Sequence, residues 1–357
     1  MGQELGESSS TRVPLLSKLL FAFVPMAIFG SFAAAQATQS ACDDNIQNSS
    51  VAISPDGRTA IASCSQRSEV FVYDLYARKV RRVLDHFVVP RKILFEPTGR
   101  YFYISDSFFG VVEKIDTVSL QTVSVLYAIP GAFGITMSSD GRSLYVNNAD
   151  ATVVSVFDLV SEQRIAQITA YSEEPHGSPP GQDGPFLYVA DFGGQKINIL
   201  VTTTSQITGE ISGFSKICAF SVTRDGKTLL VVDSGAQSIA VVDLPSRVAV
   251  ISIPIGSASG DLAISRDQRF VYSYDPRHNS LAVVALLPSH GATNPGFLEP
   301  AQGIVLSRDG SAAYVLGKDL SISRVNLSNK QIVYTIAPRS GTRVAQRLQP
   351  VKKRSGD

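Results

Sequence analysis

Five side chains that could bind or activate a small molecule occur at four well-separated places in the sequence: Arg91, Lys92, His176, Asp261 and Gln302. A guanidinium such as that of Arg91 can hold a carboxylate or a phosphate through two parallel hydrogen bonds. The His176 imidazole can exchange a proton near neutral pH, and Asp261 could orient that ring or pair with Arg91. These groups would suit a small anionic ligand if the fold brings them together.

A repeat that runs along the chain indicates how they would be positioned. Seven short segments align with one another: TAIASC (59–64), YFYISD (101–106), SLYVNN (143–148), FLYVAD (186–191), TLLVVD (228–233), FVYSYD (270–275) and AAYVLG (312–317). Their third residues are separated by 42 or 43 residues at every step. An apolar strand and, in most repeats, an Asp-Gly turn come before each segment, and Asp-Gly favours a hairpin because Gly readily takes positive φ.

Each repeat has the length and pattern of one propeller blade. Four strands of about five residues and their turns fill ~40 residues. The second strands are continuous apolar runs, as expected where neighbouring blades cover both faces. Outer strands such as KVRRVL (79–84) carry charge because they touch solvent. We predict an all-β, seven-bladed β-propeller of four-stranded antiparallel blades over residues 49–338, with a loop at 286–300 replacing most of the sixth outer strand.

The repeat also resembles a known family. Tyr145-Val146-Asn147-Asn148 precedes a valine-rich strand that ends at Asp158, Tyr188-Val189-Ala190-Asp191 matches as well, and the SPDG turn at 54–57 is typical of the same repeat. These segments resemble the YVTN β-propeller repeat, over about residues 49–337. The resemblance implies a propeller like those of bacterial exported proteins, with lactonase-type and quinoprotein-type relatives. It indicates architecture rather than one activity. WD repeats are unlikely, since the chain has no Trp.

Strand register predicts which residues meet at the upper opening of the central channel, where each first strand begins. The expected rim pairs are Ser49-Ser50, Arg91-Lys92, Phe133-Gly134, His176-Gly177, Cys218-Ala219, Gly260-Asp261 and Gln302-Gly303. Phe108 and Phe109 should lie near the same mouth, in a turn after a second strand. Converging polar groups at a concave opening predict a ligand site. Polar rim residues are also expected in a propeller channel that binds nothing.

Three functions stay open at this stage. The first is a non-enzymatic module that binds a small anionic ligand or a protein partner through the upper face and channel. The second is a hydrolase of small anionic substrates such as sugar lactones, with His176 and Asp261 as catalytic residues and Arg91 beside them. The third is an electron-transfer or dehydrogenase-associated subunit, by analogy of fold. The sequence identifies no cofactor.

Several motifs that would indicate other chemistry are absent or better explained by structure. The sequence has no zinc-type Cys/His spacing, no G-x-S-x-G elbow and no P-loop. An Asp or Asn recurs where the second strand ends, a turn position at which such side chains bond backbone. We therefore predict no metal site there. The residues concerned are Asp106, Asn148, Asp191, Asp233 and Asp275.

Composition and the termini give a prediction of location. The chain is 44% hydrophobic and has a net charge of +1, so no strong field would attract nucleic acid. Residues 1–37 have the basic, apolar and A-x-A regions of a secretory signal peptide. Residues 38–48 would form an N-terminal segment and 339–357 a basic tail. We expect an exported protein, periplasmic or extracellular, with no transmembrane span after cleavage. A lipid anchor at Cys42 is the weaker alternative, because Gln39 stands where a lipobox has Leu.

The three cysteines are Cys42, Cys64 and Cys218. Export permits a disulfide, and an odd number leaves at least one thiol over. Cys64 should end a second strand at the upper face, near the place where the chain enters its first strand after Cys42. The sequence therefore predicts a Cys42–Cys64 bridge and leaves the redox state of Cys218 open.

Overall fold

The fold is described from a computed structural model of the chain. The structure describes residues 49–338 apart from 65, 139, 149–150, 170–180, 184, 192–194, 205, 224, 256–261, 266, 276–279, 287–300 and 330. All of these residues belong to one compact unit, Ser40–Asp357. The predicted signal peptide, the N-terminal segment and the basic tail lie outside the described residues. No helix within the described residues is long and apolar enough to cross a membrane.

The described residues form seven antiparallel sheets, one per sequence repeat, numbered here as blades 1 to 7. Blades 1 to 3 hold β1 (Ser49–Ile53), β2 (Thr59–Cys64), β3 (Val70–Asp74), β4 (Lys79–Leu84), β5 (Pro90–Phe95), β6 (Tyr101–Asp106), β7 (Val111–Asp116), β8 (Thr122–Tyr127), β9 (Ala132–Met137), β10 (Ser143–Asn148), β11 (Val153–Asp158) and β12 (Gln163–Thr169). Blades 4 and 5 hold β13 (Gly181–Asp183), β14 (Phe186–Asp191), β15 (Lys196–Val201), β16 (Gln206–Ile211), β17 (Ile217–Val222), β18 (Thr228–Asp233), β19 (Ser238–Asp243) and β20 (Val248–Pro254). Blades 6 and 7 hold β21 (Leu262–Ile264), β22 (Phe270–Asp275), β23 (Ser280–Ala285), β24 (Ala301–Leu306), β25 (Ala312–Gly317), β26 (Ile322–Asn326) and β27 (Gln331–Ile336).

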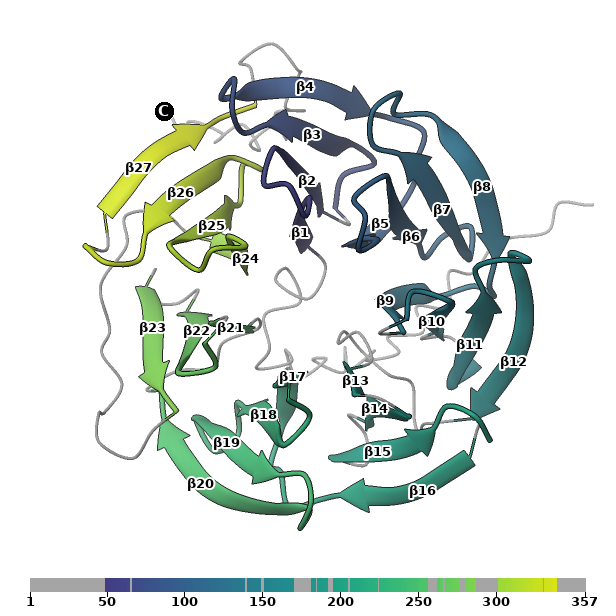
Figure 1. Cartoon of the computed structure of the whole chain (residues 1–357), viewed down its shortest axis with the longest axis vertical. Helices are drawn as coiled ribbons and strands as arrows, with labels where there is room; N and C mark the ends of the chain where they lie inside the picture. The colour runs from purple at the N-terminus through teal and green to yellow at the C-terminus, as the bar shows by residue number, and fades with distance from the viewer. Residues whose placement is uncertain are drawn as a thin grey trace, which may run out of the picture. The chain divides into compact units, whose positions relative to one another are not determined.

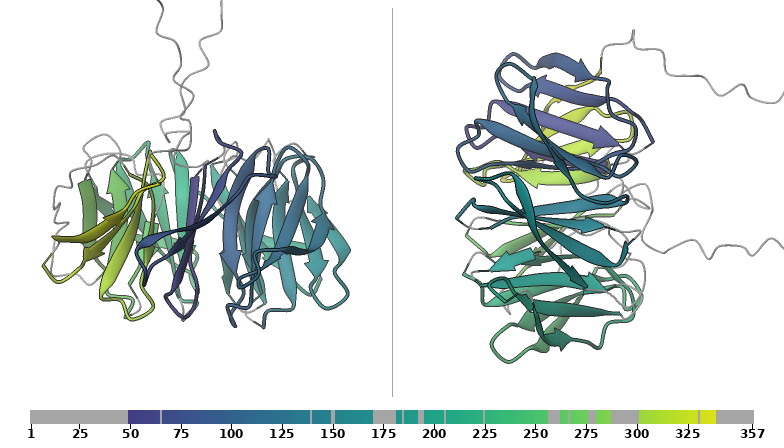
Figure 2. Two further views of the ribbon diagram at one scale, coloured as in Figure 1. Left: turned by 90° about the horizontal axis from the view of Figure 1, so that it is seen from above. Right: turned by 90° about the vertical axis from the view of Figure 1, so that its right-hand side faces the viewer.

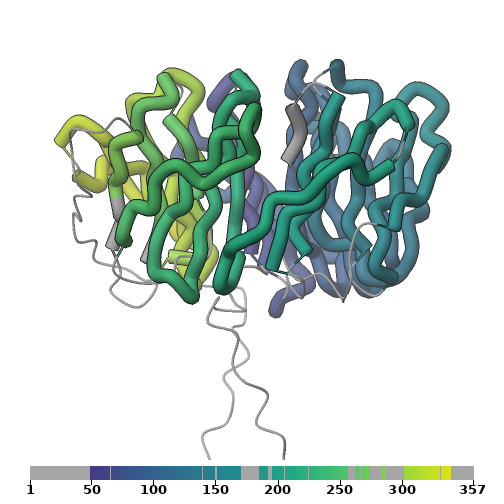
Figure 3. The backbone as a smooth tube through the Cα atoms, turned by 90° about the horizontal axis from the view of Figure 1, so that it is seen from below, coloured from purple at the N-terminus to yellow at the C-terminus, as the bar shows by residue number. Residues whose placement is uncertain are grey.

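The blades stand side by side around a central axis in the order of the chain (Figure 1). Within each blade the strands pair in sequence order, with the first strand innermost and the last strand outermost. Figures 2 and 3 show the ring edge-on, after rotation by 90° from the view of Figure 1. The seven-bladed all-β fold predicted from the repeat is therefore confirmed. Blade 6 has three strands among the described residues, and the loop predicted at 286–300 lies almost entirely outside them.

Apolar residues form the core at the seams between blades, because each inner sheet is covered on both faces. Seven clusters are present in the described part of the ring, one at each seam. Middle strands supply most of the buried side chains: β18 is buried from Leu229 to Asp233. Outer strands are mostly exposed, as in β4 and β20. Position within the blade thus explains both the continuous apolar runs and the charged outer strands.

The ring closes without an exchanged strand in the described residues. Blades 1 and 7 are each built from consecutive strands. They share an apolar cluster that includes Phe71, Tyr73, Leu316 and Ile322. The Tyr73 hydroxyl donates to the Leu320 carbonyl across this seam. Closure therefore depends on side-chain packing, like the other six seams.

Candidate functional site

The inner edge of four blades carries a β-bulge near the upper rim of the channel, where the first strand begins. At each bulge the ladder between the first and second strands shifts register. The first-strand residues left without a ladder partner are Arg91 and Lys92 in blade 2, Phe133 and Gly134 in blade 3, Cys218 in blade 5 and Gln302 in blade 7. A bulge bends the strand and redirects the side chain of the extra residue. In these four blades the bulges therefore redirect rim residues that the repeat predicted, whereas Ser49 and Ser50 of blade 1 stay in a regular ladder.

Serine side chains of second strands form hydrogen bonds with backbone groups at two of these bulges. The Ser63 hydroxyl of blade 1 donates to the Arg91 carbonyl at 2.6 Å. The Ser105 hydroxyl of blade 2 donates to the Phe133 carbonyl at 2.5 Å and accepts from the Lys92 backbone N–H at 3.0 Å. Buried backbone groups need such partners. The serines near the ends of β2 and β6 therefore hold the rim in its bulged form.

Arg91 is the centre of a small cluster on this rim. Its Nε–H donates to the Ser107 hydroxyl at 3.0 Å. Its guanidinium carbon lies 4.7 Å from the centroid of the Phe133 ring, which is a cation–π distance. The side chain is half-buried. Blade 2 thus supplies a guanidinium whose orientation is fixed by its own turn and by an aromatic ring of blade 3.

The turn that holds Ser107 also presents two exposed aromatic rings. Phe108 and Phe109 pack edge to face with centroids 5.2 Å apart, and Phe109 is 54% exposed. The Asp106 carboxylate fixes this turn by accepting the Phe108 and Val88 backbone N–H groups at 3.0 and 2.8 Å. Gly110 must close the turn: its φ is +65°, and an added Cβ would lie 2.6 Å from the Ile129 carbonyl carbon. Phe109 therefore lies on the same turn as Ser107, which accepts a hydrogen bond from Arg91.

The other predicted site residues are Gln302 and Lys92, which the structure describes, and His176 and Asp261, which it does not. Gln302 is buried at the seam between blades 7 and 1, where its Oε1 accepts the Ser49 hydroxyl at 3.0 Å. Lys92 is half-buried and has no carboxylate within 4.0 Å among the described residues. The structure thus joins Arg91, Phe133 and the Ser107 turn, while Gln302 contributes to ring closure. His176 and Asp261 lie outside the described residues.

The predicted Cys42–Cys64 bridge is wrong. Cys64 is a free cysteine, buried in the apolar cluster between blades 7 and 1, where it packs as a small hydrophobic side chain. Cys218 is disulfide-bonded instead, and its partner lies outside the described residues, as does Cys42. Sequence spacing favoured Cys64 because it ends β2 at the upper face. The strand's alternation points its thiol into the seam, whereas Cys218 is the extra residue of a bulge.

The recurring acidic residues at the ends of second strands bond backbone, as their turn position predicted. Asp233 accepts the N–H groups of Ser215, Lys216, Gly235 and Ala236, at 2.7 to 3.1 Å. Asn148 fills the equivalent place in blade 3 with its amide, which donates to the Val146 carbonyl at 2.9 Å. No cluster of His, Cys, Asp and Glu in the described ranges could hold a metal ion. Asp106 and Asp233 thus tie the upper turns of blades 2 and 5 to the connections that lead into those blades.

Sequence reasoning missed the side chains that fix the rim rather than line it. Ser63, Ser105 and Ser107 form the hydrogen bonds that hold Arg91 and Phe133. One signal was available: a serine stands next to last in both β2 and β6, inside otherwise apolar runs. Serine in a buried middle strand requires a hydrogen-bond partner.

Comparison with known proteins gives weak similarity to two curated bacterial proteins. No protein-family model matches the chain. The chain is 23% identical over 204 residues to the uncharacterized protein YwhL of Bacillus subtilis, which covers 54% of this chain and 43% of that protein. It is 27% identical over 186 residues to 6-phosphogluconolactonase of Pectobacterium carotovorum, or 46% of this chain and 55% of the relative. The chain thus spans about half the length of the curated relatives it matches.

A solved structure shares the fold over most of the chain. A chain of hydrazine synthase from Kuenenia stuttgartiensis superposes with a TM-score of 0.66 and covers 83% of this chain and 97% of its own length. Its sequence identity is 16%, so the likeness concerns the fold alone. The structure and the comparisons together define a seven-bladed β-propeller with a bulged channel rim and distant similarity to a lactonase.

Proposed function

We propose that this chain is an exported β-propeller that binds a small anionic ligand, free or carried by a protein partner, through its upper face and central channel. The observation that carries the proposal is the Arg91 cluster. Its guanidinium is held by Ser107 and Phe133, the exposed Phe109 lies on the same turn as Ser107, and Lys92 is the next residue of the bulge. An oriented guanidinium with a neighbouring cation favours a carboxylate or phosphate group.

The location proposal has support of its own. The N-terminal sequence pattern indicates a cleaved signal peptide. The disulfide at Cys218 suits an oxidising compartment, where such bonds form and persist. A direct test is to express the whole chain and determine the N-terminal residue of the protein recovered outside the cytoplasm. Recovery of the intact chain from the cytoplasm, with Cys218 reduced, would contradict export.

Binding can be tested with glucose 6-phosphate and citrate as probes, by isothermal titration calorimetry on the wild type, Arg91→Ala and Arg91→Lys. We expect Arg91→Ala to weaken binding by about tenfold or more, because truncating a charged partner costs at least ~1.4 kcal/mol. Arg91→Lys should keep only part of the wild-type affinity, since an ammonium lacks the planar, two-pronged geometry of a guanidinium. Arg82→Ala is the matched control: Arg82 is an exposed arginine on β4 and should leave binding unchanged.

A lactonase is the alternative function, favoured by the similarity to 6-phosphogluconolactonase. In that case His176 would act as the acid or base and Asp261 would orient it, with Arg91 holding the anionic group of the substrate. Hydrolysis of 6-phosphogluconolactone by the purified protein, lost in His176→Ala with an unchanged melting curve, would favour this reading. Binding of the anionic probes without hydrolysis would favour the binding module.

A further inference from the structure

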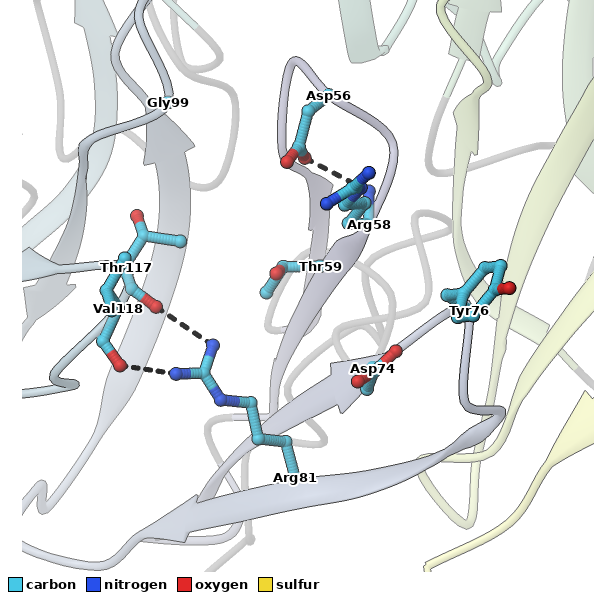
Figure 4. Close-up of a pocket in the computed structure, with 9 residues that line it drawn as sticks. All are labelled: Asp56, Arg58, Thr59, Asp74, Tyr76, Arg81, Gly99, Thr117 and Val118. Carbon is cyan, nitrogen blue, oxygen red and sulfur yellow. Dashed lines mark hydrogen bonds between the residues drawn. The ribbon is translucent and has the colours of Figure 1, made fainter.

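A second candidate site lies on the lower face, between blades 1 and 2, away from the rim. It is a pocket of about 650 Å³, within the range of small-molecule sites. The lining residues are Asp56, Arg58, Thr59, Asp74, Tyr76, Arg81, Gly99, Thr117 and Val118. Figure 4 shows Thr117 and Val118 on one wall, Asp74 and Tyr76 on the other, and Arg81 reaching across the base. The turns between strands one and two and between strands three and four supply the walls.

Arg81 reaches across the seam because it is the extra residue of a β-bulge. In six blades the outermost strand bulges at one equivalent position against the third strand. The bulged residues are Arg81, Val123, Ile165, Thr208, Val250 and Val333. The repeat therefore places a redirected side chain here in each of these blades. Blade 1 alone among them uses that position for a charged side chain.

The guanidinium of Arg81 is held in place by the neighbouring blade. One terminal nitrogen donates to the Thr117 carbonyl at 3.0 Å, and the other donates to the Val118 carbonyl. A guanidinium has five N–H donors, so three are left beside the pocket. Arg58, on the turn between β1 and β2, adds a second guanidinium at the same pocket. The site therefore has directed donors, one of them in a fixed orientation.

Tyr76 is the second departure of blade 1 from the repeat. Its side chain is 91% exposed at the edge of the pocket. The turn position that it occupies holds no aromatic residue in the other blades with a described outermost strand. The equivalent residues there are Val118, Val160, Thr203, Pro245 and Ser328. An exposed aromatic ring beside polar groups can take the apolar face of a ligand while its hydroxyl stays in water.

Two carboxylates and one hydroxyl supply acceptors that the described residues do not use fully. Asp56 and Asp74 each commit Oδ1 to nearby backbone N–H groups, at 3.0 Å from Arg58 and 2.7 Å from Ala77. Burial alone would raise the pKa of Asp56, but hydrogen bonds from Ser54 and Arg58 and the Arg58 charge lower it. The Thr117 hydroxyl is buried and has no hydrogen-bond partner in the described part of the chain. Such an unpaired hydroxyl is costly unless a bound molecule supplies the partner.

We propose that this pocket binds a neutral saccharide of about two sugar units. The two carboxylates balance the two guanidiniums, so the pocket favours neither an anion nor a cation. Sugar hydroxyls can donate to Asp56 and Asp74 while accepting from Arg58 and Arg81. The apolar face of a sugar ring would lie on Tyr76. This alternation of fixed donors, acceptors and one aromatic face matches a polyhydroxylated ring better than a phosphate or an aliphatic chain.

The absence of Trp from the sequence makes the test direct. Tyr76→Trp keeps an aromatic ring at an exposed position and becomes the only Trp emission in the protein. Val160→Trp is the matched control, because Val160 occupies the same turn of blade 3, is exposed and lies outside this pocket. Each variant is titrated with maltose, cellobiose and diacetylchitobiose, and with glucose 6-phosphate as an anionic comparison.

We expect at least one disaccharide to change the Tyr76→Trp emission with a Kd of about 1 mM or tighter, a value typical of weak specific binding. Adding Arg81→Val, which installs a residue that other blades carry, should weaken that binding by about tenfold. Ligand-observed NMR on the wild type should show the same preference. Three results would overturn the proposal: no response to any disaccharide, a response to glucose 6-phosphate alone, or an equal response in Val160→Trp.

Discussion

The inner and outer edges of the blades both carry β-bulges, and the two sets differ in what holds them. Inner bulges also recur at one equivalent position, in four blades, but hold side chains of different types such as Arg91 and Gln302, which groups of the neighbouring blade contact. Outer bulges recur at one position in six blades and hold mostly exposed aliphatic residues. A side-chain type that recurs at equivalent positions of the blades therefore indicates a structural role. A residue that differs from its equivalents in the other blades, as Arg91 and Arg81 do, indicates a position where the side chain has a role beyond the fold.

The largest predicted effect tests whether the outer edge is structurally dispensable. Leu230, in the middle strand β18, is fully buried, whereas Val250 on the outer bulge of the same blade is 57% exposed. Leu230→Ala should lower the free energy of unfolding by about 2–5 kcal/mol through transfer and cavity terms. Val250→Ala should change it by less than about 0.5 kcal/mol. Urea denaturation of both variants measures the free energy of unfolding. Similar losses in the two variants would contradict the prediction that the outer edge contributes little to stability.

The next effect concerns the connection that leads into the inner edge of blade 5. Asp233→Ala removes a buried carboxylate that accepts four backbone N–H groups, including two just before β17. We expect a loss of about 2–3 kcal/mol, since hydrogen bonds to a charged group are strong and the N–H groups would be left unpaired. Asp233→Asn should retain part of the stability, because an amide oxygen at this position can still accept a backbone N–H, as Asn148 accepts that of Ile129 in blade 3. Equal losses in both variants would argue against the hydrogen bonds as the cause.

A smaller effect should separate inner from outer hydroxyls. Ser63→Ala removes the donor to the bulged Arg91 carbonyl and should cost about 1 kcal/mol, the usual net contribution of a buried hydrogen bond. Thr335→Ala removes an exposed hydroxyl that pairs with Ser323 on the outer edge of blade 7, and should cost less. Thermal melts compare the two. A larger drop in melting temperature for Thr335→Ala than for Ser63→Ala would argue against the Ser63 hydrogen bond as a support of the Arg91 bulge.

The smallest effect is a pH dependence at the lower turns. Hydrogen bonds from the Ser307 hydroxyl, and then from the Ser311 N–H and hydroxyl, lower the pKa of Asp309 to about 2. Because its unfolded pKa is about 3.9, the carboxylate stabilises the fold above that pH, and this contribution is lost as the pH falls toward 2. Asp309→Asn should be less stable than the wild type by under about 1 kcal/mol at pH 6, given the exposure of this turn. The gap should close near pH 2, and a gap that widened in acid would contradict this assignment.

The sequence predicted the fold well because the repeat is long and its register is strict. Each marker segment, such as FLYVAD at 186–191, became a second strand, and described rim pairs such as Arg91-Lys92 lie where a first strand begins. Blade 6 has three strands among the described residues, and the loop-rich sequence expected to replace its outer strand lies almost entirely outside them.

The bulges could not be predicted from residue types. A bulge depends on how two strands pair, and Arg91 or Cys218 has no property that requires one. The same limit explains the wrong disulfide: strand ends place Cys64 at the upper face, but only the alternation of β2 shows that its thiol enters the seam. The lower pocket was missed because Tyr76 and Arg81 look like ordinary turn and outer-strand residues until the six outer bulges are compared.

The central claim is that the Arg91 bulge on the inner edge binds an anionic group. Calorimetric titration of glucose 6-phosphate into the wild type, Arg91→Ala and Arg81→Val tests it most directly, since the two variants remove one bulged arginine each. We predict that Arg91→Ala weakens binding by about tenfold or more and that Arg81→Val binds like the wild type. Unchanged binding in Arg91→Ala, or an equal loss in both variants, would contradict the claim.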